Sequence, residues 1–365
     1  MIPVKSNSVR SVILFLCFGF VLFGCESEPA IDSLFTAYQG DVPGAAVAVI
    51  KGGSVVFEGY YGLADLESKT LISAASNFRL ASVTKQFTAT AVMMLIDEDL
   101  LKLETPIRQV FPALPAFAEP ITVEHLLRHT SGLMDYESLI PDSVTVQVRD
   151  HDVLSMLETS DSLYFEPGTS YSYSNSGYAV LAMLVEKLSG QSFPAFLKAR
   201  IFDPLGMDAT LAFVEGGPAV PNRAFGYSVF EDSIAFTDQS LTSAVLGDGG
   251  IYSSISDLMK WDASLSKGGL VSAELLAQAF TPGLENYGFG WRIEEVDGHL
   301  RHSHTGSTSG FRNIIQRFPG DDLTIIILTN RNGPVVEPFA DEVALRFLYW
   351  LNELNPKSDR PILRE

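Results

Sequence analysis

Segments with strand-like patterns lie near both ends of this 365-residue chain, and helical patterns fill the region between them. Short apolar runs rich in β-branched and aromatic residues, bounded by turn residues, are typical of strands. They occur at residues 47–50, 54–57, 289–296, 311–318 and 324–329. This order predicts one antiparallel sheet built from both chain ends, with flanking helices and an inserted, mostly helical domain. The expected fold class is therefore α/β, in the mixed α+β sense.

The length of the chain suggests about two domains. We expect a sheet domain formed by residues 31–100 and 283–355, an inserted helical domain at residues 101–282, and a tail at residues 356–365. Residues 84–100 are apolar on almost every face, which predicts a buried helix whose N-terminus lies at Ser82. Further helical patterns span residues 31–39, 121–129, 179–188 and 336–354.

Residues 1–24 resemble a bacterial lipoprotein signal peptide. Lys5 and Arg10 precede an apolar run at residues 11–24, which is shorter than the roughly 20 residues that span a bilayer. The run ends in Leu-Phe-Gly followed by Cys25, which is similar to a lipobox. This resemblance implies a lipidated Cys25, a tether at residues 25–30, and export to a bacterial membrane, facing the periplasm or the surface. An ordinary cleaved signal or an uncleaved anchor is the alternative.

The charge balance limits the partners of the chain. Acidic residues outnumber basic ones, with a formal net charge of −19. Nucleic acids and anionic lipid surfaces are bound by clustered cations, and the sequence after the signal has no basic run. We therefore expect no nucleic-acid partner, and membrane contact only through the anchor. Both cysteines, Cys17 and Cys25, lie in the first 25 residues, so no disulfide is expected in the mature protein.

The first motif that carries chemistry is Ser82-Val-Thr-Lys85. Ser82 lies at the predicted start of a helix, and Lys85 is one turn further along the same face. Unpaired N–H groups at a helix N-terminus favour negative charge on the seryl oxygen, and a buried lysine can act as a base. Taken alone, this motif is weak, because Ser264 and Lys267 repeat the spacing and Ser82 could be an N-cap.

The second motif is Tyr173-Ser-Asn175, the only Tyr-x-Asn in the sequence. It lies in a polar aromatic loop before the helical pattern at residues 179–188. A phenolic oxygen beside Lys85 could pass the serine proton to a leaving group, and Asn175 could hold both Lys85 and a substrate amide. The alternative is that the loop tyrosines cap the next helix.

The third motif is His304-Thr305-Gly306, followed by Ser307. On a strand, His302 and His304 share one face. Gly306 leaves room for close approach of a substrate backbone, and the Ser307 N–H could be a second oxyanion donor beside the Ser82 N–H.

A metal site is the alternative for the histidines. The candidate ligands lie on the strand and at helical i, i+4 spacing: His299, His302, His304, His125 and His129. No cysteine or glutamate completes a recognisable metal signature, so we expect neither a metal nor an organic cofactor.

In this order, the three motifs resemble those of the serine β-lactamase and penicillin-binding fold family, in its class C-like branch of esterases, D-amino-acid peptidases and β-lactamase-related hydrolases. The similarity covers nearly the whole mature chain. It includes residues 78–86, 129–133, 204–207, 249–254 and 310–312.

The resemblance implies a β-lactamase/transpeptidase-like fold and an acyl-enzyme mechanism. Ser82 would be the acylated nucleophile, Lys85 and Tyr173 the proton network, and Asn175 a substrate-orienting residue. His304-Thr305-Gly306 would take the place of the family's Lys-Thr-Gly, and the N–H groups of Ser82 and Ser307 would form the oxyanion hole.

His304 is the informative departure from the family pattern. A lysine there is a permanent cation that can pair with a substrate carboxylate, whereas histidine is often neutral near pH 7. Carboxylate recognition would then need Arg301 or Arg312. We therefore expect a small-molecule or peptide-like acyl substrate, with esters and neutral amides favoured over β-lactams. A true β-lactamase, a D-Ala-D-Ala carboxypeptidase and a catalytically silent member that binds cell-wall fragments are the alternatives.

Overall fold

The computed structural model describes residues 30–231 and 233–354, with the side chains of residues 350–354 left out. The predicted signal peptide at residues 1–24, the lipidation site Cys25 and the tail at residues 356–365 lie outside the described residues and stay predictions.

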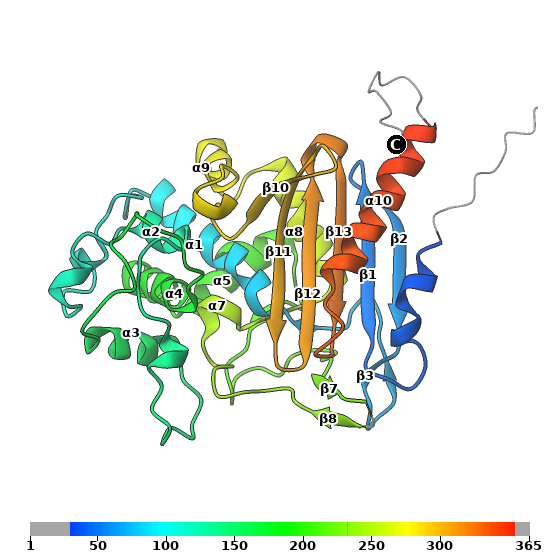
Figure 1. Cartoon of the computed structure of the whole chain (residues 1–365), viewed down its shortest axis with the longest axis horizontal. Coiled ribbons are helices and arrows are strands. Elements are labelled where there is room, and N and C mark those ends of the chain that lie inside the picture. Colours follow the sequence, from blue (N-terminus) through cyan, green and yellow to red (C-terminus); the bar gives the residue numbers. More distant parts are fainter. Residues whose placement is uncertain (1–29, 232, 355–365) are drawn as a thin grey trace, which may run out of the picture.

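The central feature is a six-stranded antiparallel sheet with the strand order β10-β11-β12-β13-β1-β2. Its strands are β1 (Ala45–Lys51), β2 (Ser54–Tyr61), β10 (Arg292–Val296), β11 (His299–Thr308), β12 (Phe311–Phe318) and β13 (Leu323–Thr329). β1 pairs directly with β13, from Ala45 opposite Thr329 to Lys51 opposite Leu323, so the two chain ends share one sheet (Figure 1). The sheet that was predicted from both termini is confirmed.

Both faces of this sheet are covered, which explains why β1 and β13, in its middle, are almost entirely apolar. On one face, Val47 and Val49 pack with the 3₁₀ helix η1 (Asp32–Tyr38) and with α10 (Glu337–Leu354), which crosses the sheet in Figure 1. On the other face, Ala46 and Ala48 belong to the main core, which includes side chains of α8 (Ile255–Lys267).

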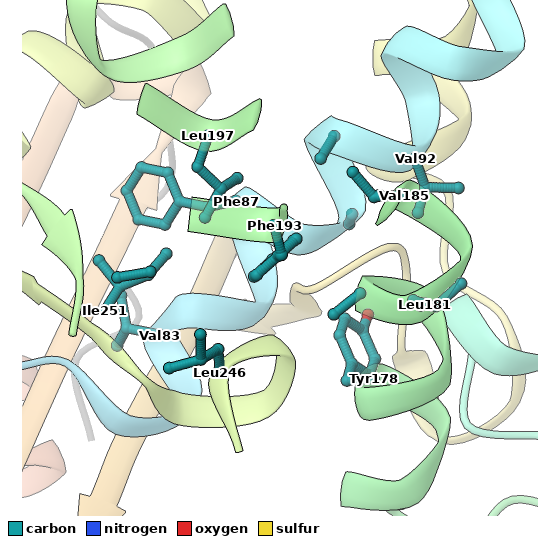
Figure 2. Close-up of a cluster of buried hydrophobic side chains, with 14 of the residues drawn as sticks. Val83, Phe87, Val92, Tyr178, Leu181, Val185, Phe193, Leu197, Leu246 and Ile251 are labelled. Atoms are coloured by element: carbon teal, nitrogen blue, oxygen red, sulfur yellow. The ribbon is translucent and has the colours of Figure 1, made fainter. Parts of the chain in front are cut away.

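The main core continues into the helical region around α1 (Lys85–Asp97). Every residue from Lys85 to Leu95 is buried, as the apolar pattern predicts. α1 packs against α4 (Asn175–Ser189) and α5 (Phe193–Leu197). Figure 2 shows buried side chains of these helices that belong to one cluster, including Phe87, Val92, Tyr178, Leu181, Val185, Phe193 and Leu197.

The region at residues 101–282 differs from the prediction of helices and loops alone. It contains β6 (Leu211–Ala212), β7 (Tyr227–Val229), β8 (Ile234–Phe236) and β9 (Ile251–Ser253). β9 joins β6 to β5 (Phe78–Arg79) in a small sheet. Strands of two or three residues are too short to show a strand alternation, so no sequence pattern indicates them. α8, which lies in this region, packs on β1 and β13. The domain boundaries stay a prediction.

The remaining elements are short. They are β3 (Leu63–Asp65), β4 (Thr70–Leu71), α2 (Val123–Leu127), α3 (Asp150–Glu158), α6 (Asp203–Leu205), α7 (Leu246–Gly249), α9 (Ala273–Ala279), the π-helical turn Lys198–Phe202, and the 3₁₀ helices Ala81–Thr84, Ile107–Gln109, Ala116–Ala118, Tyr136–Ser138, Leu284–Asn286 and Pro319–Asp321. Within the described part of the chain, no helix has the length and apolar character needed to cross a bilayer.

Candidate active site

Ser82 lies in the 3₁₀ helix η2 (Ala81–Thr84), between β5 and α1. The preceding residue, Ala81, has a φ of +50°, a left-handed conformation that costs a non-glycine residue about 1–2 kcal/mol. Such strain persists where the surrounding structure fixes the backbone, and it is common next to functional groups.

Gly306 on β11 lies directly against η2. A Cβ at this position would be 2.0 Å from the Leu80 carbonyl oxygen and 3.4 Å from the Ala81 Cβ. From the sequence, the lack of a side chain at Gly306 was expected to make room for a substrate backbone. The structure shows that the chain's own backbone occupies this space, which brings β11 next to Ser82.

The Lys85 ammonium is fully buried and has three hydrogen-bond acceptors around it. It lies 3.2 Å from the Ser82 Oγ, 2.9 Å from the Asn175 Oδ1 and 2.9 Å from the Asp248 carbonyl oxygen. An ammonium has three N–H donors, so these contacts satisfy it completely and fix its position beside the serine. Residues of two predicted motifs, Ser82 with Lys85 in one and Asn175 in the other, thus meet at one nitrogen.

Tyr173 belongs to the same cluster. The Lys85 Nζ lies 4.8 Å from the centroid of its ring, and the centroids of the Tyr173 and His304 rings are 6.2 Å apart. The Tyr173 hydroxyl is buried and has no hydrogen-bond partner among the described residues. The Tyr173 ring therefore lies beside Lys85, and the proton network through its hydroxyl stays a prediction.

His304 is buried and both of its ring nitrogens are engaged. The Nδ1 lies 2.7 Å from the Thr305 carbonyl, which can only accept, so the Nδ1 carries the proton. The Nε2 therefore accepts from the Tyr287 hydroxyl, 2.8 Å away. Burial, reinforced by the nearby charge of Lys85, lowers the pKa of His304 to about 3. His304 is thus neutral at neutral pH and offers no cation to a substrate.

Thr305 faces away from Ser82. Opposite residues of an antiparallel pair share a face, and Thr305 pairs with Ile314, which packs in the cluster under α10. Thr305 contributes to the site through its carbonyl group, which accepts from His304. Ser307 shares this face of β11, opposite Arg312, and still borders the cavity that Ser82 and Asn175 line. Its role as an oxyanion donor stays a prediction.

The predicted substrate contact of Arg312 needs correction. Its guanidinium donates to the Thr308 and Phe311 carbonyls, and its charge interacts with Glu337 and Tyr38 on the α10 side of the sheet. Arg301 also faces that side, where it pairs with Asp341 at 2.7 Å. Both arginines are therefore separated from Ser82 by the sheet. The alternation of side chains along β12 indicates the position of Arg312. Phe311 and Asn313 face the core, so Arg312, which lies between them, faces the other side of the sheet.

The cavity beside Ser82 has a volume of about 60 Å³ and contains charged residues that the motifs did not indicate. Glu137, Asp248 and Arg79 all line it. Burial and the neighbouring Asp135 raise the pKa of Glu137, with Lys85 acting in the opposite direction. Burial raises the pKa of Asp248 to about 6, although Lys85 and the Tyr136 hydroxyl both favour its charged form.

The model of the family named Beta-lactamase matches residues 31–348 of this chain. The chain belongs to the beta-lactamase family. Penicillin-binding protein 4* of Bacillus subtilis (strain 168) is 31% identical over 306 residues, which cover 78% of this chain and 67% of that protein. A D-aminopeptidase of Brucella anthropi is 30% identical over 327 residues, which cover 85% of this chain.

The solved structures agree with this membership. The penicillin binding protein from Bacillus halodurans has a TM-score of 0.76 and 26% identity, over 87% of this chain and 100% of that one. The predicted β-lactamase/transpeptidase-like fold is thereby confirmed. This beta-lactamase family chain spans only 59% of the length of the D-aminopeptidase that it matches.

The histidines of this family member do not gather into a metal site. In residues 30–231 and 233–354, no group of three His, Cys, Asp or Glu side chains lies close enough to share a metal ion. His299 instead lies 2.7 Å from Asp321, and the ring of His302 stacks on Phe280 with centroids 4.3 Å apart. His125 accepts from the Thr122 N–H at the start of α2.

The buried carboxyl of Asp248 leads to a prediction about pH. Its pKa is about 6 in the folded protein against 3.8 as the ordinary value, so between these pH values the folded state holds a proton that the unfolded state has lost. The Asp248 carboxyl therefore makes its full contribution to the free energy of unfolding below pH 4, and this contribution is lost as the pH rises through 6. In denaturant titrations, Asp248→Asn should therefore gain stability relative to the wild type across that window, by up to about 1.4 kcal/mol per pH unit. Parallel stability curves for the two proteins would contradict the assignment.

Proposed function

We propose that this protein is a serine hydrolase that cleaves amides or esters through an acyl-enzyme on Ser82. The observation that carries the proposal is the position of the Lys85 Nζ, 3.2 Å from the Ser82 Oγ and held there by Asn175 and the Asp248 carbonyl. A serine hydroxyl is a weak nucleophile unless a neighbouring base takes its proton, and Lys85 is the amine in position to take it.

The proposed reaction has an acylation stage and a deacylation stage. Lys85 accepts the proton of Ser82 as the Oγ attacks the substrate carbonyl carbon. The resulting oxyanion lies at the N–H groups of Ser82 and Ser307. The bond to the leaving group then breaks, and the proton reaches the leaving amine or alcohol through Tyr173. Water attacks the ester carbonyl, with the same network taking its proton, and Ser82 is restored as the acid leaves.

The charges around the cavity support substrates that carry a free amine. Glu137 and Asp248 line it together with Ser82, and a carboxylate there can bind a substrate ammonium. Arg79 also lines the cavity. Its guanidinium donates to the Ser243 carbonyl at 2.8 Å, and its positive charge favours the charged form of Asp248. His304 is neutral, so the position that is a lysine in the family pattern does not attract a carboxylate.

The curated relatives favour the same substrate class. One is named D-aminopeptidase, an enzyme name that implies a free amino terminus. We therefore propose amides or short peptides of D-amino acids as substrates, with esters of similar size as weaker ones. Penicillin-binding protein 4* is also a relative, so a β-lactam is the substrate of the second candidate function.

A substrate panel combined with one variant tests this proposal. We expect D-phenylalanine p-nitroanilide to be cleaved faster than its N-acetyl derivative or a chromogenic cephalosporin. Glu137→Gln should raise the KM for the free-amine substrate about 10- to 100-fold, because a hydrogen bond to a charged group contributes about 1.5–3 kcal/mol. Its KM for p-nitrophenyl acetate, which has no amine, should change little.

Glu166→Gln is the matched control, because Glu166 is exposed and does not line the cavity. It should leave the KM for the free-amine substrate unchanged. Efficient turnover of the cephalosporin with no cleavage of the anilide would favour the second candidate. Equal effects of Glu137→Gln on the amine and acetyl substrates would remove Glu137 as the ammonium site.

A further inference from the structure

His129 holds the loop that carries Tyr173 from both sides. The Ser172 N–H donates to the His129 carbonyl oxygen at 3.0 Å. The Ser174 N–H donates to the Nδ1 of the His129 ring, also at 3.0 Å. The two residues that flank Tyr173 are thus bonded to one and the same residue, which is 1% exposed. We propose that His129 is a positioning residue that fixes Tyr173 and Asn175 for proton transfer at Ser82.

The imidazole ring adds direct contact with the phenol. The centroids of the His129 and Tyr173 rings are 4.3 Å apart, and the Tyr287 ring lies 4.4 Å away on another side. Because the Nδ1 accepts from Ser174, the ring proton of neutral His129 is on the Nε2. Burial, together with the charge of Lys85, lowers the pKa of His129 well below its usual range, so the Nδ1 keeps its free lone pair at neutral pH.

His129 can act as a clamp, meaning that it holds the loop of Tyr173 in place, because its own backbone is fixed. Its φ is +59°, a strained value for a side-chain-bearing residue. The following residue, Thr130, donates its N–H to the His125 carbonyl at the end of α2. The Tyr178 hydroxyl of α4 donates to the Leu127 carbonyl of α2 at 2.9 Å. α2 and α4 are therefore joined, and His129 spans the gap between them at the point where the Tyr173 loop enters α4.

The same contact reaches Asn175. Ser174 is the N-cap of α4, and its Oγ accepts from the Gly177 N–H at 3.1 Å. Fixing the Ser174 N–H on His129 therefore sets the first turn of α4, where the Asn175 Oδ1 accepts from Lys85. One histidine thus determines the positions of two of the groups around Lys85. This inference rests on the proposed acyl-enzyme chemistry, and deepens it.

A pair of substitutions separates the ring acceptor from the bulk of the side chain. The Oδ1 of asparagine can occupy the place of the Nδ1, and asparagine tolerates a left-handed backbone. The carbonyl of glutamine is one carbon further out and corresponds to the Nε2 position. We expect His129→Gln to lower the rate of Ser82 labelling by a fluorophosphonate about 100-fold, as misplacement of a catalytic group by about 1 Å does. His129→Asn should stay within about fivefold of the wild type.

A double-mutant cycle with Tyr173→Phe shows whether His129 acts through Tyr173. With the phenol removed, His129→Gln should slow labelling much less than it does in the wild type, and the remaining loss reflects its effect through Asn175. Labelling does not depend on the natural substrate, so a labelled protein that cleaves no amide would overturn the proposed substrate class but not the clamp. Additive effects of the two substitutions in the cycle, or equal losses of labelling rate in both His129 variants, would overturn the clamp. If His129→Gln does not fold, hydrogen exchange of the folded proteins decides: protection of the Ser174 amide in the wild type and in His129→Asn supports the clamp, and rapid exchange there refutes it.

Discussion

Ser82→Ala should lower kcat on every substrate that the protein cleaves by about 10⁵-fold or more, because loss of a nucleophile removes the whole covalent pathway. The Oγ of Ser82 is the only heavy atom of the residue that the substitution removes, and among the described residues its hydrogen-bond partner is Lys85, 3.2 Å away. The fold should persist, since the surrounding backbone is fixed by β11, β5 and α1. Steady-state rates and thermal unfolding of the purified variant check both expectations.

Ser264→Ala is a matched control that the chain itself offers. Ser264 and Lys267 repeat the Ser-x-x-Lys spacing on α8, but the Ser264 Oγ donates to the Trp261 carbonyl of the same helix. This substitution should leave kcat within about twofold of the wild type, because the Ser264 hydroxyl bonds within α8 and the residue does not line the Ser82 cavity. A loss of activity in Ser264→Ala that matches the loss in Ser82→Ala would contradict the assignment of the nucleophile.

Lys85→Met should be the second most damaging substitution, with kcat lowered about 10³-fold, within the range that general bases contribute. Methionine keeps much of the side-chain length but has no proton acceptor of comparable basicity. The substitution also leaves the Asn175 Oδ1 and the Asp248 carbonyl without the donor that they share. We therefore expect a loss of about 1–3 kcal/mol in the free energy of unfolding.

Two measurements separate the chemical effect of Lys85→Met from the structural one. Denaturant unfolding gives the stability, and fluorophosphonate labelling at a temperature where the variant is folded gives the reactivity of Ser82. Slow labelling in the folded variant supports the role of Lys85 as the base. Lys267→Met, the matched control, should label at the wild-type rate. Rapid labelling of folded Lys85→Met would show that another group activates the serine.

The sheet could be predicted because two of its strands, β1 and β13, are seven residues long and buried on both faces. Residues 324–329 and 47–50 are continuous apolar runs, and such runs at the two ends of a chain have few ways to be buried other than against each other. α1 was predictable for a related reason, since it lacks a polar stripe. β6 and β9 were not, because their residues pair over only two positions each and the sequence period is lost at that length.

The site was predictable where one short motif fixes local geometry. Ser82 and Lys85 are one turn apart, so their contact follows from helical spacing once η2 and α1 form. The meeting of Lys85 with Asn175 was a hypothesis drawn from motif order. It depends on the packing of α4 against α1, which no local pattern specifies. The structure brings these two residues together at 2.9 Å.

The residues that were missed have no motif of their own. Glu137 and Asp248 reach the cavity from a 3₁₀ turn and from the short helix α7, whose positions depend on long-range packing. His129 is part of the His-Thr-Ser-Gly segment that carried the family resemblance, but its ring acceptor is used by a backbone N–H 45 residues away. Arg312 was assigned to the substrate although strand alternation could have placed it under α10.

The most direct test of the central claim is the mass of the trapped acyl-enzyme. The wild-type protein is incubated with a slowly hydrolysed activated ester, quenched in acid, digested, and mapped by mass spectrometry. We expect one acyl group per chain, located on Ser82, and none in Ser82→Ala. An acyl group on any other residue, or one that persists in Ser82→Ala, would contradict the claim that Ser82, Lys85, Tyr173 and Asn175 form the catalytic centre.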